Sequence, residues 1–384
     1  MKTGRHSTTV NTMIDSDIQM GRQLFKLFPG LVGKAPWMHL ADLPTPVHRL
    51  EKLESRLGLQ DLWIKRDDLT SQIYGGNKPR KLEFLLADAT AKHCREVLTL
   101  GGVGSNQAAA LCRFCERIGI RPILALYPQP MHSSVRKNIL VDVACQARFL
   151  LGGSTIGSCW LAARHILGAR LRGEKPPYFI YFGGSSAVGN VGFVEAGLEL
   201  AAQVKANMLP LPRYIFVPTG SCGTQAGLLV GLKAAGLPTE VIGVRVVTKT
   251  ATNRFVVAFR ANQVARYLRR LDPSFPAIRV RASEVRLLDD YYGKGYGHPT
   301  PEGKAAMRLM HDLEGLNLDP TYTGKTFAGL TDFICSKRIA DAPVLYWFTL
   351  NSVPLESMAP PDIPPDLPPP LKAYFDTPLA DPEL

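Results

Sequence analysis

The sequence predicts an α/β protein with mostly parallel sheets that helices cover on both faces. Short apolar runs of four to seven residues alternate along the chain with segments whose apolar residues recur at helical spacing. This alternation is typical of parallel sheets buried on both sides. Glycine-rich turns also follow several of the apolar runs, at the position where α/β folds bind their ligands. A length of 384 residues indicates two or three domains.

The order of the elements follows from these patterns. The expected strands are the apolar runs at residues 62–65, 97–100, 122–126, 148–151, 178–182, 214–217, 241–247 and 344–349. The expected helices cover residues 50–57, 106–118, 133–144, 159–172, 192–206, 223–235, 251–271, 301–314 and 325–338, and another begins beside residue 78. Residues 1–36 lack strong periodicity and predict an N-terminal extension. Residues 356–384 are rich in proline and predict a tail that continues neither sheet nor helix.

Composition narrows the class of protein. Hydrophobic residues make up 46% of the chain and charged residues 20%, which is ordinary for a soluble globular protein. No apolar run approaches the roughly 18 residues that span a bilayer. The net charge of +12 suggests anionic ligands, but Lys and Arg are scattered, without a basic tract that interleaves aromatic residues. We therefore expect neither a membrane nor a nucleic acid as partner.

The cysteines indicate the compartment. Their number, seven, is odd, and most lie in apolar segments, which favours a reducing compartment such as the cytoplasm over a disulfide framework. Cys112 and Cys115 form a CxxC pair inside an expected helix, and no second pair completes a zinc site. We therefore expect buried free thiols and no metal. The N-terminus has no apolar segment typical of a secretory signal, whereas a poor transit peptide stays open.

One lysine stands at the mouth of an expected helix. It belongs to the stretch Tyr74–Lys81, which reads Tyr-Gly-Gly-Asn-Lys-Pro-Arg-Lys. Pro79 suits the first turn of a helix, where its missing N–H is not needed, and it disfavours helical geometry at the preceding residue. We therefore expect Lys78 in extended geometry just outside the helix, with its amine pointing into a cleft. The alternative is a basic helix start on the surface.

A glycine-rich turn predicts an anion site. Residues Thr219 to Thr224 read Thr-Gly-Ser-Cys-Gly-Thr, after a strand and before a helix. Small residues there leave backbone N–H groups free to converge on an anion, and the helix dipole adds attraction. The turn lacks the end of a P-loop and the spacing of a dinucleotide motif, so we expect a phosphate ester smaller than a nucleotide. The alternative is a tight turn packed against its neighbours.

A second turn of this kind carries short polar side chains. Ser105, Asn106 and Gln107 end a strand and begin a helix, where they can hold a carboxylate and the serine hydroxyl can relay a proton. Plain helix capping by Ser105 is the alternative. Tyr296 and Tyr322 lie in loops flanked by turn-forming residues. Loop tyrosines serve as hydrogen-bond donors or acids, although partly buried packing is at least as frequent.

Together these features predict an enzyme that uses pyridoxal 5'-phosphate. A lysine at a loop-to-helix junction, a phosphate site and a carboxylate site are what such an enzyme needs. Lys78 would form the Schiff base with the cofactor, and after its release the same amine would take the α-proton of the substrate. The amine must be neutral for that step, which burial or a nearby positive charge favours.

The motifs also stand in the order seen in a known family. They are Gly75–Glu83, Gly104–Gln107, Gly183–Ser186 followed by Gly192–Glu195, Gly223–Gly227 and Asp319–Lys325. The chain resembles the ACC deaminase/D-cysteine desulfhydrase family, in the tryptophan synthase β-like, fold-type II group of pyridoxal phosphate enzymes. Several motifs in the right order are more specific than any one alone.

The resemblance implies two three-layer α/β/α domains with the cofactor between them. Residues 37–80 and 200–355 would form a large cofactor domain, and residues 81–199 a smaller inserted domain. We also expect the chain to form a homodimer.

The resemblance further implies a role for each motif residue. Lys78 would be the Schiff-base lysine, and Asn106 would lie near the phenolic oxygen of the cofactor. The phosphate would be held by Lys81 and the backbone of Gly220, Ser221, Cys222, Gly223 and Thr224. The substrate carboxylate would be bound by Ser105, Asn106 and Gln107. Tyr296 and Tyr322 would face the substrate as catalytic residues.

Two positions discriminate between activities within the family. ACC deaminases have glutamate after the motif tyrosine and leucine in the last core strand, whereas this chain has Thr323 and Thr349, as D-cysteine desulfhydrases do. A hydroxyl that faces the pyridine nitrogen leaves it less protonated than a carboxylate would, which suits β-elimination better than ring opening. We therefore expect a lyase that converts D-cysteine to pyruvate, hydrogen sulfide and ammonia. A 1-aminocyclopropane-1-carboxylate (ACC) deaminase is the alternative.

The chain departs from the family after its last strand. It reads Phe-Thr-Leu-Asn-Ser over Phe348–Ser352, where the family usually has His-Thr-Gly-Gly. Glycines there let the backbone approach the cofactor ring, so we expect Leu350 and Asn351 to carry side chains into that space. A reshaped pocket leaves open a different D-amino acid, a β-substituted alanine, or a paralogue that binds cofactor or amino acid without turnover.

Overall fold

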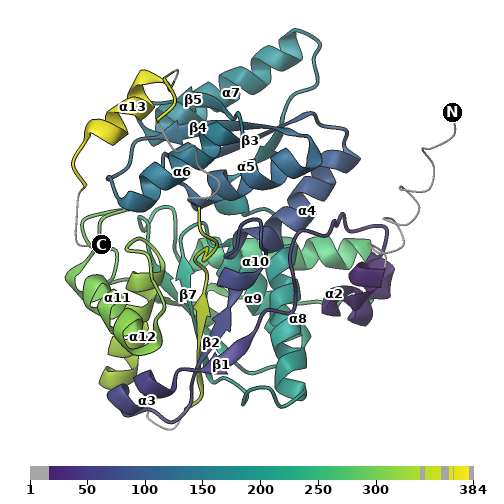
Figure 1. The fold of residues 1–384 in the computed structure, drawn as a ribbon. Helices are drawn as coiled ribbons and strands as arrows, with labels where there is room; N and C mark the ends of the chain where they lie inside the picture. Colours follow the sequence, from purple (N-terminus) through teal and green to yellow (C-terminus); the bar gives the residue numbers. More distant parts are fainter. Residues whose placement is uncertain (1–16, 338–341, 356–362, 366, 380–384) are drawn as a thin grey trace, which may run out of the picture.

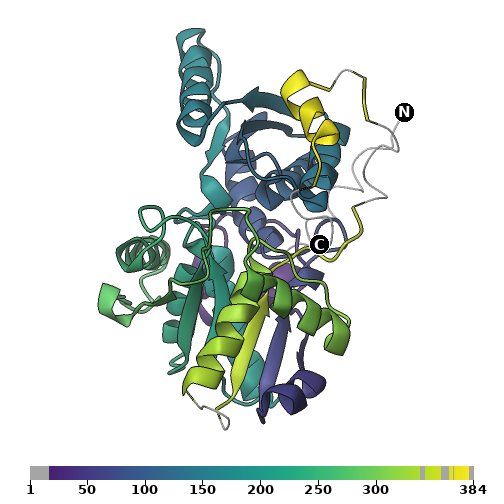
Figure 2. The same cartoon turned by 90° about the vertical axis from the view of Figure 1, so that its left-hand side faces the viewer.

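Two β-sheets, one above the other in Figure 1, organise the protein, and helices cover both faces of each. The structure is a computed structural model that describes residues 17–337, 342–355, 363–365 and 367–379. The predicted α/β class with mostly parallel sheets is confirmed. The turned view in Figure 2 shows the same two stacked layers of sheet and helix from the side.

The larger sheet joins the two ends of the chain. Its six strands lie in the order β1, β2, β10, β7, β8, β9. In that order their bounds are Val47–Arg49, Leu62–Arg66, Val344–Phe348, Tyr214–Thr219, Glu240–Arg245 and Arg286–Leu288. The β1–β2 pair is antiparallel and the other pairs are parallel. β10 lies between β2 and β7, with Val344 opposite both Leu62 and Tyr214, so the carboxyl ends of these strands meet at one edge.

The smaller sheet has four parallel strands in the order β5, β4, β3, β6. Their bounds are Arg148–Leu151, Arg121–Tyr127, Glu96–Gly102 and Tyr178–Ile180. The sequence predicted that the last of these runs to residue 182. It ends earlier because Gly183 and Gly184 take φ values of 59° and 69°, which no strand allows, and the 3-10 turn η3 (Phe182–Gly184) follows.

The helices divide between the two sheets. On the smaller sheet, α5 (Asn106–Ile118), α6 (Ser133–Ala144) and α7 (Thr155–Leu171) form the cover. On the larger sheet the cover consists of α3 (Glu51–Leu57), α8 (Val191–Lys205), α9 (Gly223–Ala234), α10 (Arg254–Leu271), α11 (Pro301–Glu314) and α12 (Thr323–Lys337). The helix α4 (Lys78–Ala91) packs against both α5 and α8. The first turn of α4 therefore lies where the two layers meet (Figure 1).

The described part of the N-terminal segment is not an extension, so that prediction was wrong for residues 17–36. The short helices α2 (Gln23–Leu27) and η1 (Pro29–Leu31) bury Leu24 and Phe25 in the core around α8. Arg22 also pairs with Glu83 of α4 at 2.6 Å. The segment gave no periodic signal because a five-residue helix is too short to show one. Residues 1–16 lie outside the described residues.

Part of the proline-rich tail is helical, which the sequence prediction excluded. The helix α13 (Pro369–Asp376) begins at prolines, which the first turn of a helix tolerates because its N–H groups need no partner inside the helix. Arg136 of α6 donates to the carbonyl of Tyr374 at 3.1 Å, and Leu371 is buried. Residues 356–362, 366 and 380–384 of the predicted tail lie outside the described residues.

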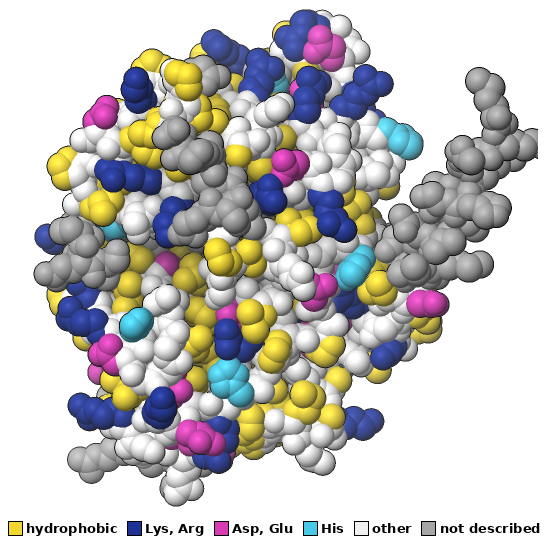
Figure 3. All heavy atoms as spheres, in the orientation of Figure 1, with side chains coloured by type: hydrophobic (Ala, Val, Ile, Leu, Met, Phe, Trp, Pro, Cys, Tyr) yellow, Lys and Arg dark blue, Asp and Glu magenta, His cyan; other side chains and the backbone are white. Residues whose placement is uncertain are grey.

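The surface and the thiols agree with the composition. On the face shown in Figure 3, Lys and Arg side chains are dispersed among other types. In the described ranges, no helix is both long and apolar enough for a bilayer. Cys112 and Cys115 are free and buried in α5, which confirms their interpretation as buried thiols.

Candidate active site

The predicted lysine lies at the start of α4. Lys78 is the first residue of that helix, so the prediction of extended geometry outside the helix was wrong. Gly76 before it takes a φ of 82°, in the left-handed region that favours glycine. The N–H of Asn77 donates to the carbonyl of Thr349 at 3.2 Å. This contact with the end of β10 holds the backbone against the local preference of a residue before proline.

The amine of Lys78 lacks the partners that buried cations usually have. Within the described ranges, no hydrogen bond or ion pair reaches its Nζ. Burial lowers the pKa of Lys78 from 10.5 to about 8. About a tenth of the amine is then neutral at pH 7, which is the form that can attack an aldehyde or take a proton.

The turn Thr219–Thr224, which we call the anion cup, joins β7 to α9. Cys222 takes a φ of 68° and stands at the N-cap of this 12-residue helix. The first N–H groups of a helix have no partner inside it, so they and the dipole attract an anion. A Cβ placed on Gly220 would meet no atom closer than 3.6 Å, whereas one on Gly223 would lie 2.3 Å from Ser185 Oγ. The cup is therefore open at Gly220 and closely packed at Gly223.

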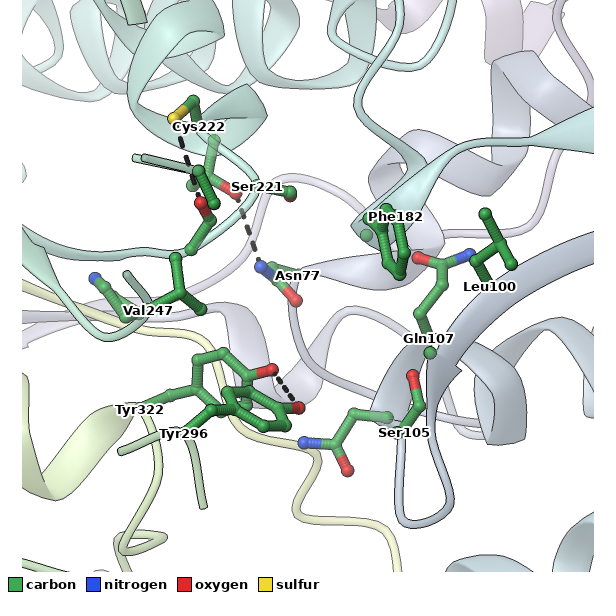
Figure 4. Close-up of a pocket in the computed structure, with 18 of the residues that line it drawn as sticks. Asn77, Leu100, Ser105, Gln107, Phe182, Ser221, Cys222, Val247, Tyr296 and Tyr322 are labelled. Atoms are coloured by element: carbon green, nitrogen blue, oxygen red, sulfur yellow. Dashed lines mark hydrogen bonds between the residues drawn. The ribbon is translucent and has the colours of Figure 1, made fainter. Parts of the chain in front are cut away.

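A single glycine connects the lysine to the anion cup. A Cβ placed on Gly183 would lie 2.4 Å from Ser221 Oγ and 4.0 Å from Lys78 Nζ. Gly183 therefore has room for no side chain. The amine of Lys78 and Ser221 of the anion cup both lie close to it. Next to the lysine, Asn77 Nδ2 donates to Thr224 Oγ1 at 3.4 Å, and a dashed line from Asn77 marks this bond in Figure 4.

Lys81 lies behind the anion cup rather than in the cavity. Its Nζ donates to the carbonyl of Gly183 at 2.9 Å and to Ser185 Oγ at 3.1 Å. Ser185 Oγ in turn lies 2.7 Å from Ser221 Oγ, so a chain of hydrogen bonds links Lys81 to the cup. Burial first, and then the charge of Lys78, lower the pKa of Lys81.

The turn Ser105–Gln107 faces the cavity from the smaller sheet. Ser105 caps α5, as the plainer alternative proposed, because its Oγ accepts the N–H of Ala108 at 3.4 Å. Asn106 Oδ1 accepts from Asn138 Nδ2 at 2.9 Å and from the Tyr74 hydroxyl at 3.3 Å. Gln107 is buried, and neither polar atom of its carboxamide has a partner among the described residues. A polar ligand would satisfy that carboxamide.

The two predicted tyrosines form a pair. The hydroxyls of Tyr296 and Tyr322 lie 2.7 Å apart, and their rings meet edge to face (Figure 4). Burial raises the pKa of Tyr296, and burial together with Tyr296 raises that of Tyr322. Both hydroxyls are therefore protonated near neutral pH and can donate hydrogen bonds.

A cavity of about 460 Å³ brings most of the predicted site residues together. In Figure 4, Cys222 and Val247 lie on one side, and Gln107 and Phe182 lie opposite them. The predicted residues that line it are Lys78, Ser105, Asn106, Gln107, Gly220, Ser221, Cys222, Thr224, Tyr296, Tyr322 and Thr349. Lys81 and Gly223 are not in the lining.

Other lining residues escaped the sequence analysis. Arg260 of α10 borders the cavity with its guanidinium 4.9 Å above the ring of Tyr181. Tyr127 and Asp319 also line it. Arg260 gave no signal because an arginine in an amphipathic helix is normally a solvated surface residue. Asp319 belongs to a quoted motif, and that position was its only signal.

In the segment Phe348–Ser352, which departs from the family pattern, Leu350 and Asn351 point in different directions. Leu350 lines the cavity, as expected. Asn351 does not, and the prediction for it was wrong: its Oδ1 accepts the N–H of Gly75 at 2.6 Å. The carboxamide turned away from the cavity because a buried N–H beside it had to be satisfied. Thr323 does not line the cavity either, and its hydroxyl donates to Asp319 Oδ2 at 2.6 Å.

The fold and the cavity define an α/β enzyme with an amine opposite an anion cup, and comparison places it in a family. Residues 39–349 match the family described as pyridoxal-phosphate dependent enzymes. The chain belongs to this family. The family resemblance carried by the motifs is thereby confirmed.

Particular relatives narrow the similarity. The chain is 35% identical to the D-cysteine desulfhydrases of Salmonella choleraesuis and Klebsiella pneumoniae over 322 residues, which cover 82% of this chain and 93% of each relative. A solved ACC deaminase homologue is 30% identical with a TM-score of 0.74, covering 88% of this chain and 99% of that one. The processed threonine deaminase isoform 2 of Solanum lycopersicum, at 15% identity and a TM-score of 0.58, shares the fold.

The residues present fit pyridoxal phosphate, the group that gives the family its name. The cofactor needs an amine for its aldehyde and donors for its phosphate. Lys78 has a lowered pKa and, in the part of the chain that the structure describes, no partner; the anion cup is open at Gly220. The unpaired carboxamide of Gln107 adds a polar group for a ligand in the same cavity.

Proposed function

We propose that this protein is a pyridoxal phosphate-dependent lyase that acts on a small D-amino acid, with D-cysteine as substrate. The observation that carries the proposal is the amine of Lys78, which has no partner among the described residues and lies across Gly183 from the anion cup. The similarity to D-cysteine desulfhydrases supports the choice of substrate. The reaction converts D-cysteine and water to pyruvate, hydrogen sulfide and ammonia.

The residues around Lys78 hold the cofactor in this proposal. The amine of Lys78 would hold the aldehyde, and the backbone N–H groups of the anion cup would hold the phosphate. Lys81 adds positive charge through Ser185 and Ser221, to which hydrogen bonds link it. When bound, the cofactor supplies an electron-accepting ring that stabilises negative charge at the substrate Cα.

The substrate carboxylate is bound by the turn Ser105–Gln107. The carboxamide of Gln107 has no partner among the described residues, and the start of α5 offers N–H groups and a favourable dipole. Asn106 Oδ1 is already engaged, so its Nδ2 would be the group available to donate to the phenolic oxygen of the cofactor. The cavity wall thereby fixes which face of Cα meets Lys78.

Proton transfer is divided between the lysine and the tyrosine pair. Lys78 Nζ takes the α-proton, for which its pKa of about 8 is suited. The paired hydroxyls of Tyr296 and Tyr322 orient the β-substituent and donate a hydrogen bond to the departing sulfur. Thr349, which lines the cavity, would offer a neutral hydroxyl to the cofactor nitrogen, and this would suit β-elimination.

The proposal is tested by incubating the purified, cofactor-loaded protein with D-cysteine, L-cysteine and ACC. Sulfide and pyruvate from D-cysteine, in equal amounts, are the expected products. ACC deamination is the second candidate, because the solved ACC deaminase homologue is 30% identical over 88% of the chain. α-Ketobutyrate from ACC without sulfide from D-cysteine would replace the first proposal by the second. Cofactor binding without any product would indicate a paralogue that has lost turnover.

We also propose that the two sheets belong to two domains. Residues 37–80 and 200–355 would form the cofactor domain, and residues 81–199 the smaller one. The continuity of β2, β7, β8 and β10 in one sheet supports this division, except that residues 191–199 belong to α8 and pack in the core of the larger sheet. Limited proteolysis of the cofactor-free protein should release fragments cut near the domain limits.

A homodimer is the oligomeric state that we propose, in the cytoplasm. All seven cysteines are free, which suits a reducing compartment. Large apolar side chains are exposed on α7 and α10, which Figure 2 shows toward the same side of the molecule. They are Ile156, Trp160, Leu167, Leu171, Phe255 and Phe259. Sedimentation should give twice the chain mass, and the double substitution Ile156→Glu, Leu171→Glu should give monomers; a monomeric wild type would refute the dimer.

A further inference from the structure

The segment after β10 lies beside the loop that presents Lys78. β10 pairs in parallel with β2, and Phe348 at its end lies opposite Arg66 at the end of β2. The two segments that follow these strands therefore leave the sheet at the same edge. One continues as Thr349–Ser352, and the other becomes the loop that ends at Lys78.

Three hydrogen bonds join these two segments. The N–H of Gly75 donates to Asn351 Oδ1 at 2.6 Å, and the N–H of Asn77 donates to the carbonyl of Thr349 at 3.2 Å. Ser352 Oγ donates to Asp68 Oδ2 at 2.7 Å. The bonds bracket the lysine loop at its start and its end, so Thr349–Ser352 forms a clasp over it.

The carboxamide of Asn351 is itself fixed. Its Nδ2 donates to the carbonyl of Val353 at 3.0 Å, and its Oδ1 also accepts the N–H of Val353 at 3.1 Å. These bonds set the orientation of the amide, so that Oδ1 faces Gly75. A carboxamide fixed in this way holds the N–H of Gly75 in one position.

The bonded glycine has no freedom to move away. A Cβ placed on Gly75 would lie 1.9 Å from the carbonyl oxygen of Asp68 and 3.2 Å from Asn351 Oδ1. The backbone of Gly75 is thus packed against Asp68 and hydrogen-bonded to Asn351. A buried N–H in such a place is costly to leave without a partner, and Asn351 supplies that partner.

We propose that Asn351 is a positioning residue that places the amine of Lys78 in the cavity. It acts through Gly75, three residues before the lysine, and not through contact with the ligand, because Asn351 does not line the cavity. Leu350 beside it does line the cavity. Within the clasp, Leu350 therefore shapes the cavity wall and Asn351 holds the lysine loop. The inference rests on the proposed attachment of the cofactor at Lys78.

Three variants test the inference. Asn351→Ala removes the acceptor, and Asn351→Asp keeps an oxygen for the Gly75 N–H. Asn262→Ala is the matched control, because Asn262 of α10 also bonds a backbone N–H and C=O, those of Val280, at 2.9 and 2.8 Å. The readouts are the rate at which added pyridoxal phosphate attaches to the cofactor-free protein, the pH midpoint of that rate, kcat, KM and the melting temperature.

We expect Asn351→Ala to slow attachment and lower kcat by about tenfold each, with KM changed less than about twofold. Asn351→Asp should recover attachment to within about threefold of the wild type, and Asn262→Ala should lower the melting temperature without slowing attachment. If Asn351→Ala attaches the cofactor at the wild-type rate, or if it and Asn262→Ala change every readout alike, the inference is wrong.

Failure of the inference is distinct from failure of the proposed function. A wild-type protein that does not attach the cofactor at Lys78 refutes both. A wild type that attaches it there, with an Asn351→Ala variant that matches it, refutes the inference alone. Should Asn351→Ala not fold, slow attachment in a folded Asn351→Asp variant would equally contradict the role of the oxygen.

Discussion

The first turn of α4 carries cations on two sides, and they differ in whether an anion pairs with them. Lys78 on the cavity side is half-buried, and its amine has no partner among the described residues. Arg80, two residues later on the core side, pairs with Asp67 at 2.7 Å and with Glu199 at 2.8 Å. Lys81 is intermediate, because its hydrogen-bond partners, Gly183 O and Ser185 Oγ, are both neutral.

The difference separates a chemical role from a structural one. Burial alone would lower the pKa of Arg80, but Asp67 and Glu199 outweigh it and raise that pKa. At Lys78 no anion opposes burial, and the pKa falls to about 8. An ion-paired cation therefore fixes the helix in place, whereas the cation without an anionic partner can serve as a nucleophile and base, the role that we propose for Lys78.

The largest expected effect comes from removing the unpaired cation. Lys78→Ala should lower D-cysteine turnover by about 1,000-fold or more, because it removes both the attachment point and the base. Lys78→Arg keeps the charge without a usable nucleophile and should be equally inactive. Steady-state sulfide release measures both. Activity within tenfold of the wild type in Lys78→Ala would mean that the amine is not the reagent.

Removing the paired cation should instead affect folding. Arg80→Met leaves Asp67 and Glu199 buried without their guanidinium, and we expect the free energy of unfolding to fall by about 3–5 kcal/mol. Urea denaturation followed by circular dichroism measures the change. The control is Arg172→Met, whose exposed pair with Glu174 should contribute less than about 1 kcal/mol. Equal effects of the two substitutions would remove the distinction between the two sides of the helix.

The intermediate cation should affect cofactor affinity. Lys81→Gln removes the charge behind the anion cup, so the dissociation constant of pyridoxal phosphate should rise by about 10- to 100-fold. The affinity for pyridoxal, which lacks the phosphate, should change little. Equilibrium titration measures both ligands, and Lys92→Gln at the far end of α4 is the control. A loss of affinity equal for the two ligands would place Lys81 outside phosphate binding.

The smallest expected effect is a dependence on pH. Only the neutral amine attacks the aldehyde, so attachment to the cofactor-free protein should accelerate about tenfold per pH unit below pH 8 and level off above the pKa of about 8. Stopped-flow absorbance measures the rate, with a simple alkylamine as reference. A rate that keeps rising toward pH 10 would show that burial does not lower the pKa of Lys78.

The sequence predicted what depends on neighbouring residues. Helical and strand periodicity gave most of the elements but not the short strands β1 and β9, and the glycine turns after strands predicted the anion cup. What the sequence could not supply depends on partners far along the chain. Glu199 lies 119 positions from Arg80, and Gly75 lies 276 positions from Asn351. No local pattern encodes such pairs, so the structural role of Arg80 and the orientation of Asn351 were not predicted.

The same reason explains the errors at both ends of the chain. Leu24 and Phe25 become part of the core only because α8 lies against them. The prolines before Leu371 indicate a helix start as readily as a tail, and packing of α13 on α6 decides between the two.

The most direct test of the account is to find which amine takes the cofactor. The protein is loaded with pyridoxal phosphate and reduced with borohydride, which fixes the cofactor on the amine it has reached, and the modified peptide is identified by mass spectrometry. We predict modification of Lys78 and none of Lys65, whose amine is paired with Glu199 at 2.5 Å. Modification of Lys65, Lys81 or another lysine in place of Lys78, or of none, would contradict the account.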